Sequence, residues 1–579
     1  MDLESTISAY QGVLSKFEFQ KAQTASEDFA QKRFLKKMEV PDRARSAERR
    51  RACWLNYITK DSSLPHEIVL PSPEWYKART RCHQAFSGKR LLLNFSGFGP
   101  GSSYEPTRGQ NSIEARLASN KWSCTPDAFE AFASMVYRTS ALKKAFRRRY
   151  NHWFHSRHFK ESKAEADRIL YKRFARLESS KHDIAWNISL WKLSQVTTFV
   201  HGSRFSTVSK NNEKDRPINI EPLGNLLVQR SIGKYIREIL KFYFGVDLDI
   251  LQEVHRGMIK IGDVATIDLS DASDSVSIAL CYFLLPRWLF RKLMAARSPM
   301  LFGLDRDFHL TRKISSMGNG FTFELMTIIL LSLCRVLDPQ SSVYGDDIII
   351  KKDKAHRLIK LLEEVGFSVN LTKTHIDDGF RESCGANYSE TEGYIKSYDF
   401  RYPTTIADCI VSHNKAYHLG VIYPSFKLLW ETLHRFTPKS LRGPISSSEE
   451  NLGSRSRFEA DRSTEMPSQE DFELWFESPD APALLSRKLR RKCELVAAAW
   501  QHPTDSISAF IGFKFIPELR SKTVKTIHTH RHWAKYLMYL AAGRVSDDVI
   551  TDSGGWAPVK YLSIGSSVFR ASDLERYLS

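Results

Sequence analysis

The sequence has little of several features that mark membrane, secreted and zinc-binding proteins. Its longest apolar run, residues 326–334, is far shorter than the roughly 20 residues that a transmembrane helix needs. The N-terminal stretch MDLESTISAY lacks the basic flank and apolar segment of a signal peptide. Eight cysteines occur without a close C-x-x-C pair, which disfavours a zinc ribbon and favours a reducing compartment. We therefore expect a cytoplasmic protein with no membrane partner.

Charge and length point to a large protein that binds a polyanion. The chain has 579 residues, with 85 Lys and Arg against 66 Asp and Glu, a formal net charge of +19. This length is too great for one hydrophobic core, so roughly two to four packed subdomains are expected. A basic excess of this size favours nucleic acid as the partner.

Two basic runs lie in the first two hundred residues, which have a helical pattern. They are residues 43–51 (RARSAERRR) and 147–163 (RRRYNHWFHSRHFKESK). A charge run is most often a solvated helix face. The second run also contains four aromatic residues, Tyr150, Trp153, Phe154 and Phe159. Basic residues that alternate with aromatic residues are also typical of proteins that bind single-stranded nucleic acid, so both interpretations stay open for this run.

From about residue 200 the pattern predicts an α+β fold. We expect strands at 264–269 and 368–376, helices at 277–297, 321–337 and 352–365, and a hairpin around VYGDDIII at 343–350. Pro286 is expected to kink the first of these helices. Beyond residue 400 the chain is again mostly helical. Residues 440–471, rich in Ser, Glu and Arg, predict a mobile insertion.

Two acidic motifs predict a metal site. Asp346 and Asp347 follow Gly345 in the hairpin turn, and Asp268 follows an apolar strand in ATIDLSDASDS. Carboxylates this close repel each other, so a positive charge has to compensate them. Carboxylates that meet at the ends of neighbouring strands can hold two Mg²⁺ ions about 4 Å apart. The alternative for Asp268 is an N-cap of the next helix, a role that Asp271 fits at least as well.

Two further stretches suit a nucleotide. The segment KNNEKDR supplies Lys210, Lys214 and Arg216, which can bind phosphate oxygens. The segment SSMGNGFT, residues 315–322, offers hydroxyls, an amide and two glycines before a helix. It suits a backbone that approaches a sugar or a template. The simpler interpretations are a solvated loop for the first and a glycine-containing helix entry for the second.

These motifs occur in one order along the chain, which is KNNEKDR, ATIDLSDASDS, SSMGNGFTFEL, VYGDDIII, NLTKT and FRESCGANY. The series resembles the catalytic subunit of the replicases of single-stranded RNA bacteriophages, the leviviruses. The resemblance is dense from about 205 to 400 and looser elsewhere. It implies a right-hand polymerase fold whose antiparallel palm sheet carries the GDD hairpin. Fingers would lie mainly in 1–204, the palm with inserted fingers segments in 205–400, and a thumb and C-terminal region in 401–579.

The resemblance also implies residue roles. Asp268 and Asp346 match the principal metal ligands, Asp347 is a third carboxylate, and the backbone carbonyl of Leu269 completes one metal's ligands. Lys373 matches the lysine that protonates the leaving pyrophosphate. The ribose and the template would be tested by the loop that contains Ser316, Gly318 and Asn319. The segment 380–385 (FRESCG) matches a hairpin that supports the primer end, so Cys384 is structural there rather than a nucleophile.

At two places the sequence departs from the family pattern. Many RNA polymerases have an aspartate five residues after the first metal ligand, where this chain has Ser273 followed by Asp274. Both stay candidates for sensing the 2′-hydroxyl, because phage replicases show the same shift. Related replicases have lysine where this chain has Glu213, followed here by Lys214. A base displaced by one residue in an extended loop faces the other way, so Lys210 and Arg216 are favoured over Lys214.

The expected activity is RNA-directed RNA synthesis from ribonucleoside triphosphates, with two Mg²⁺ ions or Mn²⁺ in their place. The rival interpretations are a reverse transcriptase, which shares Tyr-x-Asp-Asp, and a catalytically inactive RNA-binding subunit. The resemblance further implies template and product RNA as partners, in the cytoplasm of a bacterial host. It also implies host elongation factors Tu and Ts, and in some members an RNA-binding ribosomal protein.

Overall fold

The computed structural model describes residues 3–38, 42–99, 103–104, 116–117, 119, 121–157, 162–177, 180–404 and 406–437, together with four short strands further on. The chain divides into two compact units. The first consists of residues 1–42, 211–213 and 396–579, and the second of residues 43–210 and 214–395. The catalytic motifs predicted from the sequence all lie in the second unit, apart from the tip of KNNEKDR.

The first unit joins helices from two distant parts of the sequence. Its described helices are α1 (Leu3–Lys16), α2 (Ala25–Lys37), α17 (Ile406–Gly420) and α18 (Pro424–Arg435). Their shared core includes Phe34, Phe400 and Phe426, whose rings lie 4.8–6.4 Å apart. Buried Glu27 accepts hydrogen bonds from the backbone and hydroxyl of Ser425, which ties α2 to α18. The N-terminal helices are therefore built into the same unit as the helices after residue 400.

Four short strands complete the described part of this unit. They are β15 (Arg442–Gly443), β16 (Ser454–Arg455), β17 (Phe513–Ile516) and β18 (Gly555–Pro558). The first two pair in parallel and the last two antiparallel. Apart from β15 and β16, the predicted insertion at 440–471 lies outside the described residues, so its mobility stays a prediction.

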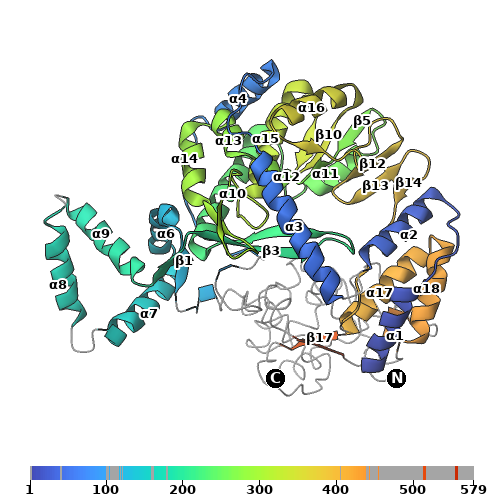
Figure 1. Cartoon of the computed structure of the whole chain (residues 1–579), viewed down its shortest axis with the longest axis horizontal. Coiled ribbons are helices and arrows are strands. Elements are labelled where there is room, and N and C mark those ends of the chain that lie inside the picture. The colour runs from blue at the N-terminus through green and yellow to red at the C-terminus, as the bar shows by residue number, and fades with distance from the viewer. Residues whose placement is uncertain are drawn as a thin grey trace, which may run out of the picture. The chain divides into compact units, whose positions relative to one another are not determined.

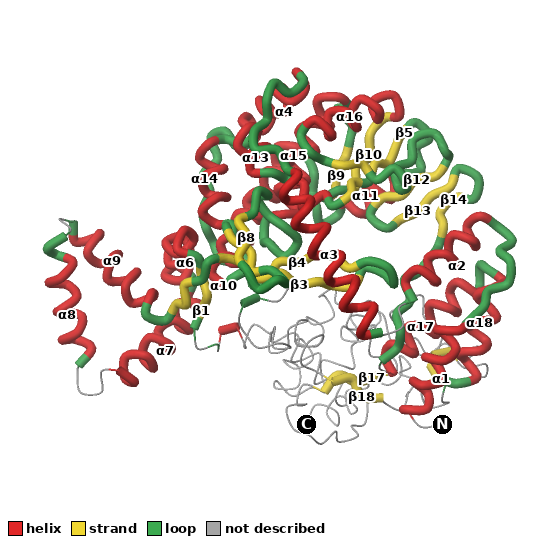
Figure 2. Tube along the Cα trace, viewed as in Figure 1, coloured by secondary structure: helices red, strands yellow, loops and turns green. Residues whose placement is uncertain are grey.

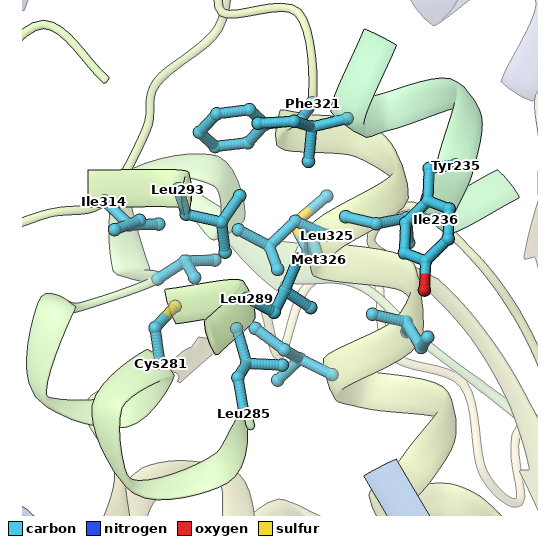
Figure 3. Packing of buried hydrophobic residues seen from close by; sticks show 14 of the residues in the cluster. Tyr235, Ile236, Cys281, Leu285, Leu289, Leu293, Ile314, Phe321, Leu325 and Met326 are labelled. Carbon is cyan, nitrogen blue, oxygen red and sulfur yellow. The ribbon is translucent and has the colours of Figure 1, made fainter. Parts of the chain in front are cut away.

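The second unit is built around a large helical core. Its described helices are α3 (Arg43–Ser63), α4 (Pro73–Ala85), α6 (Pro126–Arg138), α7 (Ser140–Arg157), α8 (Lys163–Phe174), α9 (Lys181–Ser194), α10 (Leu223–Phe244), α11 (Leu251–Met258), α12 (Ala272–Ser275), α13 (Ile278–Leu284), α14 (Arg287–Ala296), α15 (Thr322–Leu337) and α16 (Lys352–Glu364). Figure 3 shows side chains of α10, α13, α14 and α15 converging, among them Ile236, Leu289 and Leu325. This packing fixes α15, the helix that supports the GDD hairpin.

The strands of the second unit form several small sheets (Figure 2). They are β1 (Trp122–Cys124), β2 (Thr197–Phe199), β3 (Gly202–Ser209), β4 (Asp215–Ile220), β5 (Val264–Ile267), β6 (Leu269–Ser270), β7 (Met300–Phe302), β8 (Phe308–Leu310), β9 (Ser342–Tyr344), β10 (Asp347–Lys351), β11 (Ser368–Val369), β12 (Phe380–Ser383), β13 (Ala386–Ser389) and β14 (Gly393–Ile395). The sheet orders are β5-β10-β9, β4-β3-β7-β8, β12-β13-β14, and the pairs β1-β2 and β11-β6. The central sheet, β5-β10-β9, is antiparallel throughout. The predicted α+β class, with an antiparallel sheet that carries the GDD hairpin, is confirmed.

Two predicted elements differ from the structure. The helix expected at 277–297 is two helices, α13 and α14, because Pro286 ends one and occupies the N-cap position of the other instead of kinking a single helix. The strand expected at 368–376 stops after Val369. The chain then turns, with the Lys373 N–H donating to the Asn370 carbonyl (3.0 Å), and His375 returns to form an isolated bridge with Thr266.

The aromatic residues of the second basic run face the core of the second unit. Tyr150 and Phe154 are buried in α7, and Trp153 packs against the same core. Phe159 lies outside the described residues. The interpretation of these described aromatics as a stacking surface for bases is therefore wrong. Their helical spacing places them on the buried face of α7, and the basic residues Arg147 and Arg148 occupy the exposed face. No helix within the described ranges is long and apolar enough to cross a membrane.

Candidate active site

The GDD turn is a two-residue hairpin loop held against α15. Tyr344 pairs with Asp347 across the hairpin, which leaves Gly345 and Asp346 as the loop. Gly345 has φ 65°, and a Cβ there would lie 2.6 Å from the Phe323 ring, so glycine is required at this position. Its N–H donates to Thr327 Oγ1 of α15 (3.0 Å). Ile348, Ile349 and Ile350 anchor the outgoing strand in the core.

Asp268 reaches the same end of the sheet from the neighbouring strand. Because Ile267 pairs with Ile348 across β5 and β10, the next residue, Asp268, lies beside the GDD turn. Asn370 makes two hydrogen bonds to Asp268. The Asn370 N–H donates to the Asp268 carbonyl (2.9 Å), and Asn370 Nδ2 donates to Asp268 Oδ2 (2.8 Å). The side chain of Asp268 stays 21% exposed. Asp268 is thus fixed in orientation and still accessible.

The carboxylates repel each other, as the sequence predicts. Burial raises the pKa of Asp346, and the charge of Asp268 raises it further. Burial raises the pKa of Asp347 to about 7, with the charge of Asp346 as the next largest cause. Lys373 and Lys210 lower the pKa of Asp346, yet the net shift is upward. The nearby lysines therefore leave the site short of positive charge.

The donor set fits a hard divalent cation. Carboxylate oxygens are the ligands that Mg²⁺ prefers, and a bound cation would supply the missing charge. Within the described residues, however, no group of three or more His, Cys, Asp or Glu side chains is arranged to hold a metal ion. Leu269 lies in β6, directly after Asp268 and paired with Val369. The use of its carbonyl as a ligand stays a prediction.

Asp271, not Asp268, occupies the N-cap position of the following helix, α12. Its own carboxylate makes no cap hydrogen bond; Oδ2 instead accepts one from Asn56 Nδ2 (3.3 Å). The N-cap alternative for Asp268 is therefore wrong, and its carboxylate is left for the sheet end.

Lys373 lies beside Asp268, and its predicted role toward the pyrophosphate stays a prediction. Its Nζ is 4.0 Å from Asp268 Oδ2 and 3.7 Å from Glu382 Oε1. The turn after β11 brings it to the sheet end. Glu382, on β12, was not among the predicted residues, although it lies inside the quoted FRESCG motif. Nothing in that motif indicates that Glu382 lies opposite Lys373.

The basic segment KNNEKDR connects β3 and β4. The Lys210 N–H donates to the Lys214 carbonyl (3.0 Å), which brings the two strands together. Burial lowers the pKa of Lys210, followed by the charges of Arg216 and Lys373, while Asp268 and Asp271 raise it. Lys210 is thus electrostatically linked both to Arg216 and to Asp268. The predicted lesser role of Lys214 stays a prediction.

The predicted sugar-testing loop is closely packed. Gly318 has φ 104°, and a Cβ there would lie 2.2 Å from the Asn219 carbonyl, so only glycine fits against β4. Ser316 and Asn319 are buried. Asn319 Oδ1 accepts from the Phe321 N–H (3.0 Å), which fixes the amide at the entry of α15.

Asp274 is buried and ion-paired, whereas Ser273 is half-buried. Lys313 Nζ donates to Asp274 Oδ1 (3.1 Å), and Lys313 is itself only 1% exposed. Burial raises the pKa of Asp274, and the Lys313 ammonium is the largest opposing influence. Ser316 also hydrogen-bonds the carboxylate. The structure thus brings together Asp274 and Ser316, while the choice between Asp274 and Ser273 stays open.

The segment 380–385 forms a hairpin, as predicted, with Ser383 paired with Ala386 across the turn. Cys384 and Gly385 both have positive φ, 51° and 76°, as a tight two-residue turn requires. The Cys384 N–H donates to the Asp347 carboxylate. Burial raises the pKa of the Cys384 thiol to about 12, which agrees with a structural cysteine rather than a nucleophile.

The sequence did not identify Tyr57, Asn219 and Lys313, which surround Ser316 and Asp274. Lys313 lies only three residues before Ser316, and a buried lysine beside a motif could have been suspected. Tyr57 lies in α3, about 160 residues from the nearest motif, and nothing in the sequence marks it.

Comparison with known proteins places this site in a recognisable segment. The family described as RNA replicase, beta-chain, matches residues 184–459. The chain is 37% identical over 266 residues to the RNA-directed RNA polymerase subunit beta of Escherichia virus Qbeta, covering 43% of this chain and 44% of that protein. It is 35% identical over 264 residues to the RNA-directed RNA polymerase beta chain of Enterobacteria phage fr, covering 43% and 48%. The matches thus span about half the length of these relatives.

Among solved structures, the RNA-dependent RNA polymerase of bacteriophage phi12 aligns at 11% identity with a TM-score of 0.38, covering 87% of this chain and 83% of that one. So low a score carries no weight for the fold. The resemblance to phage replicases that the motifs predicted is confirmed by the sequence relatives.

Proposed function

We propose that this chain is an RNA-directed RNA polymerase that replicates a positive-strand RNA phage genome by adding ribonucleotides to an RNA 3′-hydroxyl. The observation that carries the proposal is that Asp268, Asp346 and Asp347 lie at one end of the β5-β10-β9 sheet, close enough for their charges to act on one another. Burial and the neighbouring carboxylates raise the pKa of Asp346 and of Asp347. The names of the sequence relatives support the same activity.

Asp268, Asp346 and Asp347 would hold two Mg²⁺ ions, or Mn²⁺ in their place, with the Leu269 carbonyl as a further ligand. Such ions supply charge that favours ionisation of an attacking hydroxyl and neutralises phosphate oxygens. Asn370 keeps the Asp268 carboxylate turned toward the site. The backbone N–H of Cys384 does the same for Asp347. These contacts reduce the reorganisation needed when the reactants bind.

Four basic residues serve the triphosphate. Arg216 forks onto phosphate oxygens, and Lys210 adds a second positive charge beside it. Lys373 donates a proton to the pyrophosphate as it leaves. Its position between Asp268 and Glu382 directs it toward the sheet end. Lys214 has the smaller share.

The ribose is read by Asp274, with Ser273 as the rival, and by Ser316 and Asn319. A 2′-hydroxyl donates to a carboxylate and accepts from an amide, so an acid and an amide recognise it together. Gly318 lets the loop approach β4 closely. In the structure Asp274, Ser316 and Asn319 are all buried. Reading the sugar therefore requires the loop or its cover to move when the nucleotide binds.

The proposal includes template RNA, product RNA and ribonucleoside triphosphates as partners, in the cytoplasm of a bacterial host. The Qbeta relative is named a subunit, which supports an assembly with other chains. The host elongation factors Tu and Ts, and an RNA-binding ribosomal protein, are the partners that the family resemblance implies.

Primer extension on an RNA template tests the activity, with ribonucleotides or deoxyribonucleotides supplied separately. The chain is assayed alone and with elongation factors Tu and Ts, and Asp346→Asn is the matched control for each condition. We expect ribonucleotide addition that the control lacks. A preference for deoxyribonucleotides would instead indicate a reverse transcriptase. RNA binding without addition in every condition would indicate an inactive RNA-binding subunit.

A further inference from the structure

Helix α3 brings two polar side chains to the predicted sugar-testing loop. In Figure 1 this helix crosses β3 and passes α12, and it also contacts β4. Tyr57 and Asp61 lie four residues apart on it, and both are buried. Residues four apart share one face of a helix. This face of α3 therefore contributes directly to the walls of the site, although α3 lies outside the segment that matches the replicase family, residues 184–459.

Tyr57 links β4 to the loop through its hydroxyl. The Tyr57 oxygen is 2.7 Å from Ser316 Oγ, and Asn219 Nδ2 donates to it at 3.1 Å. Burial raises the pKa of Tyr57 well above its ordinary value, so the hydroxyl keeps its proton and can donate. Ser316 in turn hydrogen-bonds the Asp274 carboxylate. A carboxylate only accepts, which makes Ser316 the donor there and leaves Ser316 to accept from Tyr57.

The Tyr57 hydroxyl also lies 3.3 Å from Asn219 Oδ1, but Ser316 Oγ is the nearer acceptor at 2.7 Å. The shorter hydrogen bonds therefore run in one direction, from Asn219 Nδ2 through Tyr57 and Ser316 to Asp274. Each hydroxyl in this chain donates once and accepts once. Such a chain fixes the rotation of the Ser316 hydroxyl, which otherwise has several settings. It also leaves one carboxylate oxygen of Asp274 with spare acceptor capacity for a substrate hydroxyl.

Lys313 packs against the face of the Tyr57 ring and joins Tyr57 to Asp274. Its Nζ lies 3.3 Å from the centre of the Tyr57 ring and 3.1 Å from Asp274 Oδ1. The Asp61 carboxylate accepts hydrogen bonds from the backbone N–H groups of Arg312 and Lys313, at 3.1–3.2 Å. The tyrosine ring, the acid and the helix thus hold one buried ammonium in place, and that ammonium offsets the charge of Asp274.

We propose that Tyr57 and Lys313 are positioning residues for sugar selection, acting through Ser316 and Asp274. This inference rests on the proposed polymerase function and adds a determinant of ribonucleotide preference from helix α3. Tyr57 sets the direction of the Ser316 hydroxyl, and Lys313 keeps Asp274 available as a charged acceptor. Neither residue touches the nucleotide.

Tyr57→Phe tests the first half, because it removes only the hydroxyl and keeps the ring over Lys313. The matched control is Tyr137→Phe on α6, which loses a single hydrogen bond to the Ser189 carbonyl (2.8 Å) away from the site. The readout is kcat/KM for a ribonucleotide divided by that for its deoxy form, on one RNA template. We expect Tyr57→Phe to narrow this ratio about three- to tenfold, the effect of one buried hydrogen bond. The control should leave it unchanged.

Lys313→Met tests the role of Lys313, and we expect it to narrow the same ratio of kcat/KM. Lys313→Arg should restore part of that ratio because it keeps the charge. Equal slowing of both nucleotides by Tyr57→Phe, with an unchanged ratio, would overturn the proposal and leave Tyr57 a packing residue. Thermal unfolding of each variant sets the assay temperature below its Tm, so that lost folding is not mistaken for lost selectivity.

Equilibrium binding of the same two nucleotides to each variant separates this inference from the function on which it rests. A wild type that adds no nucleotide but binds the ribo form more tightly, with the preference reduced in Tyr57→Phe, would contradict the polymerase and support the positioning role. A wild type that extends RNA while Tyr57→Phe keeps both ratios would contradict the positioning role alone.

Discussion

Asp347 and Asp274 are both buried carboxylates whose pKa values burial raises, yet they differ in what lies opposite them. Among the charges around Asp347, Asp346 raises its pKa most, and Asp268 and Glu382 raise it further. Asp274 has the buried ammonium of Lys313 at 3.1 Å. Like charges that a fold holds together require a cation from outside the chain, whereas an acid with its own buried base does not. The carboxylates around Asp347 are thus suited to binding a cation, and Asp274 to accepting a hydrogen bond.

The largest expected effect comes from removing one charge from the carboxylates around Asp347. Asp346→Asn or Asp268→Asn keeps the side-chain shape and loses a ligand charge. We expect nucleotide addition to fall at least about 10³-fold for both ribo- and deoxyribonucleotides, since several kcal/mol of electrostatic stabilisation are lost. Single-turnover incorporation and RNA binding measure the two consequences, and RNA binding should persist. Activity within about tenfold of the wild type would refute the metal assignment.

Substitution at Asp274 or Asn319 should change selectivity more than rate. Asp274→Ala or Asn319→Ala removes a group that can pair with the 2′-hydroxyl, a loss of about 1–3 kcal/mol. We expect the ribo- over deoxyribonucleotide ratio of kcat/KM to narrow about five- to 100-fold, mainly through slower ribonucleotide addition. If both variants keep the wild-type ratio, the sugar-reading role belongs elsewhere, and Ser273→Ala becomes the next variant to measure.

A smaller difference is expected between the bases of the β3–β4 connection. Arg216→Ala should raise the KM for nucleotides about tenfold, since a guanidinium–phosphate contact is worth more than about 1 kcal/mol. Lys214→Ala should raise it less. The two variants are matched, because each removes one positive charge from the same segment. Greater damage from Lys214→Ala would show that the orientation assigned to this segment is reversed.

The smallest effect concerns stability. Burial and neighbouring charge raise the pKa of Asp347 from 3.8 to about 7, so between about pH 4 and 7 the folded protein holds a proton that the unfolded chain has released. The stabilisation from this group is therefore complete below pH 4 and is lost as the pH rises through 7. A divalent cation should replace the proton above that pH.

We accordingly expect Mg²⁺ to raise the Tm by a few degrees at pH 8, about the effect of a ligand well above its Kd, and by less at pH 6. Differential scanning calorimetry of the metal-free protein with added Mg²⁺ measures both shifts. In Asp347→Asn the shift at pH 8 should shrink, while Asp274→Asn should keep it. Equal shifts in the wild type and Asp347→Asn would remove Asp347 from the cation site.

The sequence by itself determined the parts of this protein that depend on local chemistry. The glycine of VYGDD and its flanking β-branched residues specify a tight hairpin with Asp346 at its tip, because a two-residue loop needs positive φ. The apolar strand before Asp268 and the long apolar helix at 321–337 could be predicted for the same local reasons, and both are found as β5 and α15. The order of the motifs was enough to predict the family resemblance.

The tertiary structure decided what depends on distant neighbours. The aromatics of α7 have the composition of a base-stacking surface, and only packing shows that Tyr150 and Phe154 belong to the core. The residues after Val369 could have continued the strand, but the chain turns at Asn370, whose side-chain amide donates a hydrogen bond to Asp268. Tyr57 contacts Lys313, which lies more than 250 residues later in the chain, and Lys313 in turn pairs with Asp274. Charge compensation in a buried site depends on which groups share the space, and that is set by the packing of the whole unit.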